Sequence, residues 1–308
     1  MIAVVVNKSS GKGLAKSLLP KLERLNDRSN EIELIAEDSE SQTIQSLKSL
    51  SSDKDLSGDI YIALGGDGLI NLCVQEIKRR GTKVKGLLVY PCGTGNDFAK
   101  CNNQKPFDLQ ILTDLSKCNY SQKPIDLGRV KGQSNTTRYF GQVLSTGFDS
   151  LVNERANRFK FIRGKIKYTI ATLMVLMRFK PMKYQIEIDG RRISTSAMLV
   201  SVANGHTYGG GMQIVPHAKN DDGFLDLIIL EPVSKFELLK VFPKVFKGRH
   251  VNHPKVSFHR GKNIEIDIVG EEVHFAYADG ERFFPLPISI AIEEKSLPIL
   301  QLSNFNER

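Results

Sequence analysis

Two stretches, Gly65-Gly66-Asp67-Gly68-Leu69 and Pro91-Cys92-Gly93-Thr94-Gly95-Asn96-Asp97-Phe98, each follow a short apolar run, Ile60–Leu64 and Leu87–Tyr90. An apolar run that ends in closely spaced glycines is typical of a buried strand that turns into the start of a helix. Glycine lets the backbone approach a ligand, and the first N–H groups of a helix bind anions. A carboxylate among those amides repels phosphate unless a divalent cation bridges the two. The pair of loops therefore predicts a nucleotide–magnesium site and not a dinucleotide site.

The composition bounds the class of protein. A chain of 308 residues with 41% hydrophobic content favours two domains. Its four cysteines show no Cys-x-x-Cys spacing, which argues against zinc or a redox pair and favours a reducing compartment. The N-terminus shows no signal peptide, and the longest uncharged apolar stretch, 168–177, is too short to span a bilayer. We expect a soluble cytoplasmic protein.

The net charge of +9 is concentrated in two segments. Residues 155–183 contain nine basic and no acidic residues, and residues 240–263 contain seven basic and no acidic residues. Such patches attract nucleic acid or anionic lipid, or they are ordinary solvated faces. In the first segment the charges alternate with Phe159, Phe161 and Ile162. That mixture favours a segment at a lipid surface, hence peripheral membrane association and no nucleic-acid partner.

The order of predicted elements divides the chain in two. The first 123 residues alternate strands and helices, which predicts a parallel sheet covered by helices on both faces. The predicted elements are strands at Ile2–Val6, Ile32–Ala36, Ile60–Leu64 and Lys85–Tyr90 and helices at Leu14–Leu25, Thr43–Leu50 and Leu69–Arg80. Both glycine loops then follow strand ends, where ligands bind in such sheets.

Strands dominate after residue 123, and one helix, Lys165–Phe179, interrupts them. The predicted strands are Tyr139–Leu144, Tyr184–Ile188, Ala197–Ala203, Leu225–Leu230, Ile264–Val269 and Val273–Ala278. Asp189-Gly190 has the composition of a hairpin turn. We predict an α/β domain at 1–123, completed by 287–308, and a β-rich lipid-substrate domain at 124–286.

The two loops and further motifs in the same order resemble the diacylglycerol kinase catalytic-domain family, in its bacterial soluble branch, which is related to sphingosine kinases. The other motifs are Asn7-Lys8-Ser9-Ser10-Gly11, Ile125-Asp126-Leu127-Gly128, Gly147-Phe148-Asp149, Gly209-Gly210-Gly211-Met212 leading to Asp222-Gly223, and Asp279-Gly280-Glu281. The resemblance implies a Rossmann-like N-terminal domain, a β-sandwich C-terminal domain and an ATP site in the cleft between them. It also implies ATP-dependent, Mg²⁺-dependent phosphorylation of a diacylglycerol-like lipid at an anionic membrane surface.

The resemblance also implies roles for individual residues. The triphosphate-binding residues would be Asn7, Ser9, Gly65, Gly66, Asp67, Gly68, Thr94 and Asn96. Asp67, Asp97 and Asp126 would organise the catalytic Mg²⁺, and Asp279 or Glu281 would be the general base. Asp222, with the carbonyls of Lys219 and Phe224, would hold a structural Mg²⁺. A homodimer is possible.

Two departures from the family pattern leave the exact activity open. Leu69 stands where bacterial diacylglycerol kinases usually have threonine, and Leu72 stands where glutamate is common. The first departure is more similar to sphingosine-type lipid kinases. The residues are also compatible with an NAD kinase, a distant relative that shares Gly-Gly-Asp-Gly, and with a catalytically weak lipid-surface sensor. Gly65–Gly68, Asp222-Gly223 and Asp279-Gly280 could each be simple turns.

Overall fold

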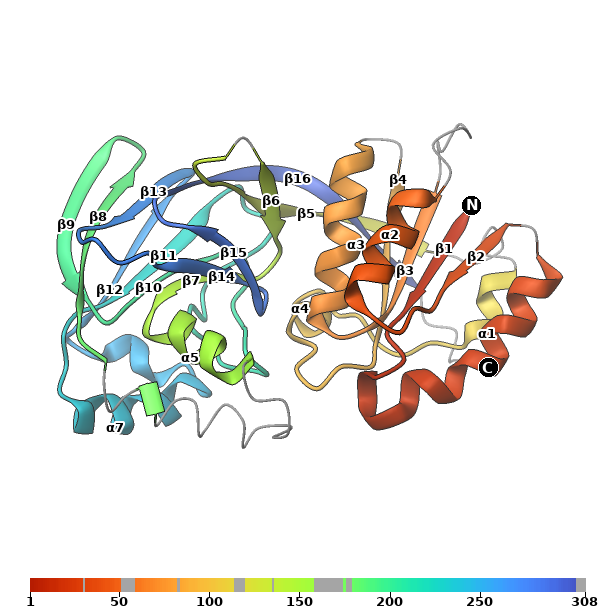
Figure 1. Cartoon of the computed structure of the whole chain (residues 1–308), viewed down its shortest axis with the longest axis horizontal. Helices are drawn as coiled ribbons and strands as arrows, with labels where there is room; N and C mark the ends of the chain where they lie inside the picture. The colour runs from red at the N-terminus through yellow and green to blue at the C-terminus, as the bar shows by residue number, and fades with distance from the viewer. Residues whose placement is uncertain are drawn as a thin grey trace. The chain divides into compact units, whose positions relative to one another are not determined.

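A computed structural model describes residues 1–29, 31–50, 59–81, 84–113, 120–134, 136–157, 174–175 and 179–302 (Figure 1). The chain forms two compact units, Met1–Ile125 with Lys295–Arg308, and Asp126–Glu294. Strands β5 (Tyr120–Lys131) and β16 (Ile288–Leu302) carry the chain from one unit into the other.

The first unit is an α/β domain with a parallel sheet in the order β2-β1-β3-β4-β16. Its other strands are β1 (Ile2–Val6), β2 (Ile32–Ile35), β3 (Asp59–Gly65) and β4 (Val84–Pro91). Its helices are η1 (Ser10–Gly13), α1 (Leu14–Arg28), α2 (Glu40–Ser49), α3 (Asp67–Arg80), α4 (Asp97–Cys101) and η2 (Leu109–Thr113). The predicted alternation is confirmed.

Apolar side chains on both faces of β1 and β3 explain why helices cover the sheet on both sides. Ile60, Ile62 and Leu64 pack with Leu22 and Leu25 of α1 on one face. The alternate residues of β3 point to the other face, which α2 and α3 cover (Figure 1).

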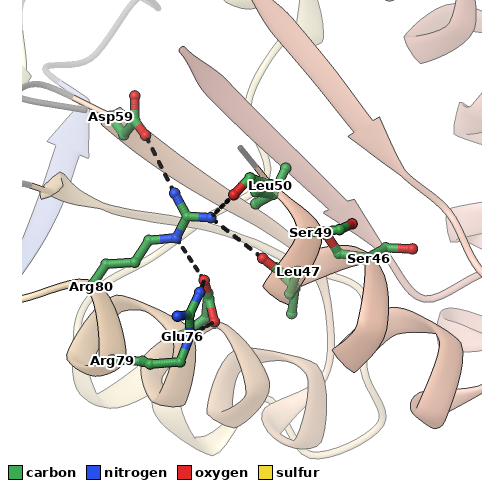
Figure 2. Close-up of polar contacts among 8 residues, drawn as sticks. All are labelled: Ser46, Leu47, Ser49, Leu50, Asp59, Glu76, Arg79 and Arg80. Atoms are coloured by element: carbon green, nitrogen blue, oxygen red, sulfur yellow. Dashed lines mark hydrogen bonds and ion pairs between the residues drawn. The ribbon is translucent and has the colours of Figure 1, made fainter. Parts of the chain in front are cut away.

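An ion-pair network on the α2–α3 side fastens these helices to the sheet (Figure 2). Arg80, whose side chain is 6% exposed, pairs with Glu76 through Nε and Oε1 at 2.6 Å and lies 4.0 Å from Asp59. Its Nη2 donates to the carbonyl oxygens of Leu50 at 2.6 Å and of Leu47 at 3.4 Å. One buried guanidinium therefore ties the end of α2 to α3 and lies beside the start of β3.

The second unit is a β-sandwich. One sheet has the order β12-β11-β10-β7-β14-β15, and the other contains β16, β13, β8 and β9 with the pair β5–β6. Their bounds are β6 (Thr137–Phe140), β7 (Val143–Gly147), β8 (Met182–Ile188), β9 (Arg191–Ala197), β10 (Leu199–Ala203), β11 (Leu225–Leu230), β12 (Val256–Gly261), β13 (Asn263–Ile268), β14 (Phe275–Ala278) and β15 (Glu281–Pro285). Val200, Val202 and Leu227 from one sheet pack with Ile186 and Ile264 from the other.

Helices α5 (Phe148–Asn157) and α7 (Lys235–Val245) lie against the six-stranded sheet (Figure 1). The short helix η4 (Arg249–Asn252) follows α7 in the chain. Phe148 and Val152 of α5 and Leu238 and Val245 of α7 share one apolar cluster with Ile228 of the sheet. Helix α7 was not predicted. Its signal was the capping pattern Ser234-x-x-Glu237, in which Ser234 accepts a hydrogen bond from the Glu237 N–H at 3.2 Å.

Two predicted strands are wrong in their extent. Tyr139–Leu144 contains a break at Gly141-Gln142 between β6 and β7, because those N–H groups donate to the Asp279 carboxylate. Ala197–Ala203 contains a break at Met198 between β9 and β10, which belong to different sheets. The predicted helix Lys165–Phe179 lies mostly outside the described residues, as do Arg158, Lys160, Arg163 and Lys165 of the first basic segment.

Candidate active site

The two glycine loops of the first unit lie against each other, backbone to backbone. A Cβ on Gly93 would lie 2.4 Å from the Gly66 Cα, and a Cβ on Gly66 would lie 3.1 Å from the Gly93 Cα. Any side chain at Gly93 would push the loops apart. The structure thus gives a packing reason for glycine in both motifs, beside the close approach to a ligand that the sequence suggested.

A third loop joins them at the carboxyl end of β1. Asn7 Oδ1 accepts hydrogen bonds from the Ser9 N–H at 3.0 Å and the Ser9 hydroxyl at 2.7 Å. Gly11 has φ +67°, and a Cβ there would lie 2.6 Å from the Cys92 carbonyl oxygen. The loops after β1, β3 and β4 therefore converge at one edge of the parallel sheet, where such folds bind ligands.

Asp67 connects the two glycine loops, those after β3 and after β4. It is the first residue of α3, and its Oδ1 accepts a hydrogen bond from the backbone N–H of Phe98 at 2.9 Å. The first turn of α3 has N–H groups without intrahelical partners, and its positive dipole end favours anions. A carboxylate at this point also attracts a cation.

The loop after β4 ends in a short helix that carries Asp97. Asn96 has φ +53° and precedes α4, and Asp97 is 3% exposed. Lys100 Nζ donates to the Gly95 carbonyl oxygen at 2.7 Å and so holds the loop, whereas Thr94 is exposed. Carboxylates are the ligands that Mg²⁺ prefers, so Asp67 and Asp97 fit that ion by donor chemistry.

Leu69 and Leu72, the two departures from the family pattern, lie in α3. Leu69 is 6% exposed, and its side chain fills the space beside Gly65, where a Cβ would lie 2.6 Å from Leu69 Cδ2. Leu72 is half-buried. Leu69 therefore acts as a packing residue beneath the loop, which weakens its use as a marker of the acceptor lipid.

In the second unit, Asp126 is buried and fixes the turn at 220–223. Its Oδ2 accepts a hydrogen bond from the Gly223 N–H at 2.7 Å, and its N–H donates to the Asn220 carbonyl oxygen at 2.7 Å. Asp126 is 1% exposed. The structure thus places two predicted motifs, at Asp126 and at Asp222-Gly223, side by side.

The Asp222 carboxylate forms an ion pair with the side chain of Arg260. Arg260 Nη2 is hydrogen-bonded to Asp222 Oδ2, and the guanidinium lies over the Phe224 ring at 4.5 Å from its centroid. Asp222 Oδ1 accepts from the Phe224 N–H at 3.2 Å. Burial raises the pKa of the neighbouring Asp226, against the charges of Arg260 and His217.

These contacts do not fit the structural Mg²⁺ expected at Asp222 with Lys219 and Phe224. A metal ion bound to the Asp222 carboxylate would have to displace the Arg260 guanidinium, which already neutralises it.

Asp279-Gly280 is a two-residue hairpin turn between β14 and β15, with φ values of +52° and +88°. The Asp279 carboxylate accepts hydrogen bonds from the N–H groups of Gly141 at 2.8 Å, Gln142 at 3.0 Å and Val143 at 3.3 Å. The carboxylate is thus an anchor for the β6–β7 turn, while Glu281 begins β15.

The Asp189-Gly190 hairpin uses its aspartate in the same way and confirms the predicted turn. The Asp189 carboxylate accepts from the N–H groups of Lys262 and Asn263, and those backbone hydrogen bonds lower the pKa of Asp189. Two Asp-Gly turns in one sandwich therefore serve as backbone anchors. The likeness between the two turns favours a structural role for the Asp279 carboxylate.

Sequence reasoning missed Asn204, which links these elements. Its Nδ2 donates to the carbonyl oxygens of Asp126 and Gly141, both at 2.9 Å, and the side chain is fully buried. Asn204 thereby joins the Asp126 strand to the turn that Asp279 anchors. The available signal was Asn204-Gly205 directly after the apolar run 199–203.

Family models match both units of the chain. A diacylglycerol kinase catalytic domain model matches residues 1–130, and a YegS C-terminal NAD kinase beta sandwich-like domain model matches residues 142–301. The chain belongs to the diacylglycerol kinase family.

Curated relatives agree with the family models. A diacylglycerol kinase of Mycobacterium tuberculosis (strain CDC 1551 / Oshkosh) is 36% identical over 244 residues, which cover 79% of this chain and 77% of the relative. A diacylglycerol kinase of Staphylococcus epidermidis (strain ATCC 35984) is 30% identical over 308 residues, which cover 99% and 93%. These relatives place the chain among lipid kinases.

A solved structure supports the fold. The crystal structure of a diacylglycerol kinase from Bacillus anthracis superposes with a TM-score of 0.66 at 19% identity and covers 97% of this chain and 95% of that one. Among the helices that the structure describes, none has both the length and the apolar character needed to cross a bilayer.

Proposed function

We propose that this protein is an ATP-dependent lipid kinase that transfers the γ-phosphoryl group of ATP, with Mg²⁺, to the hydroxyl of a diacylglycerol-like lipid. The observation that supports this most is the convergence of the Asn7, Gly66 and Gly93 loops, with Asp67 bonded across two of them. We call these three converging loops the phosphate cradle. Phosphoryl transfer requires mainly positioning of the reacting groups and neutralisation of their charge, and the cradle can supply both.

The residues of the cradle would hold the triphosphate through backbone N–H groups at Gly66 and Gly68, with Asn7, Ser9 and Thr94 nearby. Asp67 and Asp97 would hold Mg²⁺, which when bound would neutralise phosphate charge. The assignment of Asp126 to the same ion, and of ATP to a cleft between the domains, stays a prediction from the resemblance.

Glu281 would accept the proton of the lipid hydroxyl as general base. Asp279 would instead hold the hairpin that presents Glu281, since its carboxylate already accepts three backbone hydrogen bonds. Asp279-Gly280 forms the turn and Glu281 is the first residue of β15. The hairpin therefore holds the backbone position of Glu281.

A direct transfer assay tests the function. The purified protein is incubated with Mg²⁺ and γ-labelled ATP, and diacylglycerol micelles, sphingosine micelles and NAD are offered separately. We expect label in the diacylglycerol product, and about 100-fold less label or lower with an Asp67→Asn variant. Preferential labelling of sphingosine or of NAD would replace the proposal with the corresponding kinase, and no transfer to any acceptor would leave a lipid-surface sensor.

A further inference from the structure

Helix α7 has an exposed apolar stripe. Phe236 is 80% exposed, Leu239 is 42% exposed, and Phe246, directly after the helix, is 44% exposed. These are three of the seven large, exposed apolar side chains in the described part of the chain, gathered within eleven residues. Their spacing of three and seven residues places them on one side of the helix. The opposite side is used for the fold, since Leu238, Val241 and Val245 are buried.

A stripe of lysines runs beside the apolar stripe. Lys240, Lys244 and Lys247 are exposed and follow a spacing of four and three residues, so they lie along one side of the helix. Within the part of the chain that the structure describes, none of the three forms an ion pair. The acidic residue of the helix, Glu237, is engaged by His253 Nε2 at 3.1 Å. The surface therefore combines unneutralised positive charge with exposed apolar groups.

This combination fits an anionic lipid surface. An interfacial helix inserts its apolar side chains at the boundary between headgroups and acyl chains, and its lysines reach back to the headgroups. At about 1.5 Å per residue an eleven-residue helix is roughly 16 Å long, which is too short to span a bilayer and suits a position in the interface plane.

A second copy of the chain could also cover the α7 surface, but the charge of the surface argues against this partner. A two-fold interface would place this surface against itself and bring like-charged lysine stripes together. A partner made of anionic lipid neutralises the lysines and buries Phe236, Leu239 and Phe246 at the same time.

We propose that the α7 surface, formed by Phe236, Leu239, Lys240, Lys244, Phe246 and Lys247, docks the protein on anionic bilayers. The inference rests on the proposed lipid kinase function for its purpose, because a lipid acceptor resides in a membrane. The binding itself does not depend on catalysis, so the two can be tested separately.

The first experiment uses the absence of tryptophan from the sequence. Phe236→Trp places a single reporter on the α7 surface, and Val273→Trp, at a residue that is 68% exposed in the loop before β14, is the matched control. We expect a blue shift of emission, and quenching by brominated acyl chains, for Phe236→Trp with phosphatidylglycerol-containing vesicles and not with pure phosphatidylcholine. A solvent-exposed spectrum with both vesicles would overturn the proposal.

The second experiment measures vesicle sedimentation. Replacing Lys240, Lys244 and Lys247 with glutamine should weaken binding to anionic vesicles about 100-fold, since each basic residue at such a surface contributes about fivefold. The matched control replaces three exposed lysines elsewhere, Lys48, Lys105 and Lys131, and should bind nearly as wild type. If both variants lost vesicle binding equally, the loss would be explained by the change in net charge alone, and the proposal would be overturned.

Activity separates this proposal from the proposed function. The α7 lysine variant should phosphorylate a short-chain, water-soluble diacylglycerol at the wild-type rate. If wild type binds vesicles through α7 and phosphorylates no lipid, docking stands and the kinase assignment fails. If wild type is an active kinase whose vesicle binding is unchanged by the lysine substitutions, α7 docking is wrong.

Discussion

The Asp67 carboxylate accepts a 2.9 Å hydrogen bond from the backbone N–H of Phe98, so the first residue of α3 is tied to the loop after β4. Two motifs separated by about thirty residues in sequence are thereby held as one surface. One oxygen of the carboxylate serves the loop, and the negative charge remains available for a cation.

Asp67→Asn should separate these two roles. Asparagine keeps an oxygen that can accept from Phe98 but lacks the charge, so stability should change by less than about 1 kcal/mol. Turnover should fall about 10²-fold or more, as when a charge-stabilising group is removed from an active site. Thermal unfolding and lipid phosphorylation measured on the same preparation check both. A variant that keeps wild-type turnover would contradict a role for Asp67 in holding Mg²⁺.

Gly93→Ala should damage the cradle more than Gly66→Ala. The new Cβ at residue 93 would lie 2.4 Å from the Gly66 Cα, whereas the reverse contact is 3.1 Å. Overpacking of this kind costs about 1–3 kcal/mol, and we expect the larger loss of stability and of ATP affinity at residue 93. Calorimetric ATP titration and denaturant unfolding give the comparison. Equal effects at the two positions would argue against the backbone contact.

Asp279→Asn and Glu281→Gln should have different consequences. Glu281→Gln should lower the rate by about 10²–10⁴-fold with little change in stability, because it removes the proposed base. Asp279→Asn should destabilise the fold by about 1–3 kcal/mol, because the amide cannot accept all three backbone hydrogen bonds. The measurements are steady-state rates and unfolding in urea. The reverse pattern would make Asp279 the base.

Arg80→Met should lower the free energy of unfolding by about 3–5 kcal/mol. The substitution leaves the carbonyl groups at the end of α2 without their buried donor, and it leaves the buried Glu76 carboxylate with the half-exposed Arg79 as its remaining partner (Figure 2). Arg79→Met is the matched control, since Arg79 also pairs with Glu76 but is 51% exposed, and it should cost less than about 1 kcal/mol. Chemical denaturation followed by circular dichroism would detect the difference, and similar losses for both would show that the buried network contributes little.

Stability should fall in alkali because of Cys73. Burial raises the pKa of this thiol to about 12 in the folded protein, from an ordinary value near 9. Between those values the unfolded chain loses the proton and the folded chain keeps it, so the free energy of unfolding falls by up to about 1.4 kcal/mol for each pH unit between about 9 and 12. Cys73→Ala should show a shallower decline between pH 9 and 11 in denaturant titrations. An unchanged slope would contradict the linkage.

The sequence determined the elements and motifs whose signal is local. Apolar runs that end in glycine predicted β3 and β4 with their loops, and alternating strands and helices predicted the parallel sheet, because burial on both faces leaves a continuous apolar pattern. The order of the motifs was sufficient for the family resemblance. Asp189-Gly190 predicted its hairpin because both positions need a left-handed backbone, which Asp-Gly tolerates.

Only the tertiary structure decided what the polar groups of the motifs contact. The sequence alone gives no reason to prefer Asp279 or Glu281 as the base. The structure shows a contact that only tertiary folding creates: the β6–β7 turn, more than 130 residues away, donates its backbone N–H groups to the Asp279 carboxylate. Arg260 reaches Asp222 through the antiparallel pairing of β11 with β12, and Asn204 joins Asp126 to Gly141 across strands distant in the chain. Such partners depend on strand register and burial, which are long-range properties that local composition does not encode.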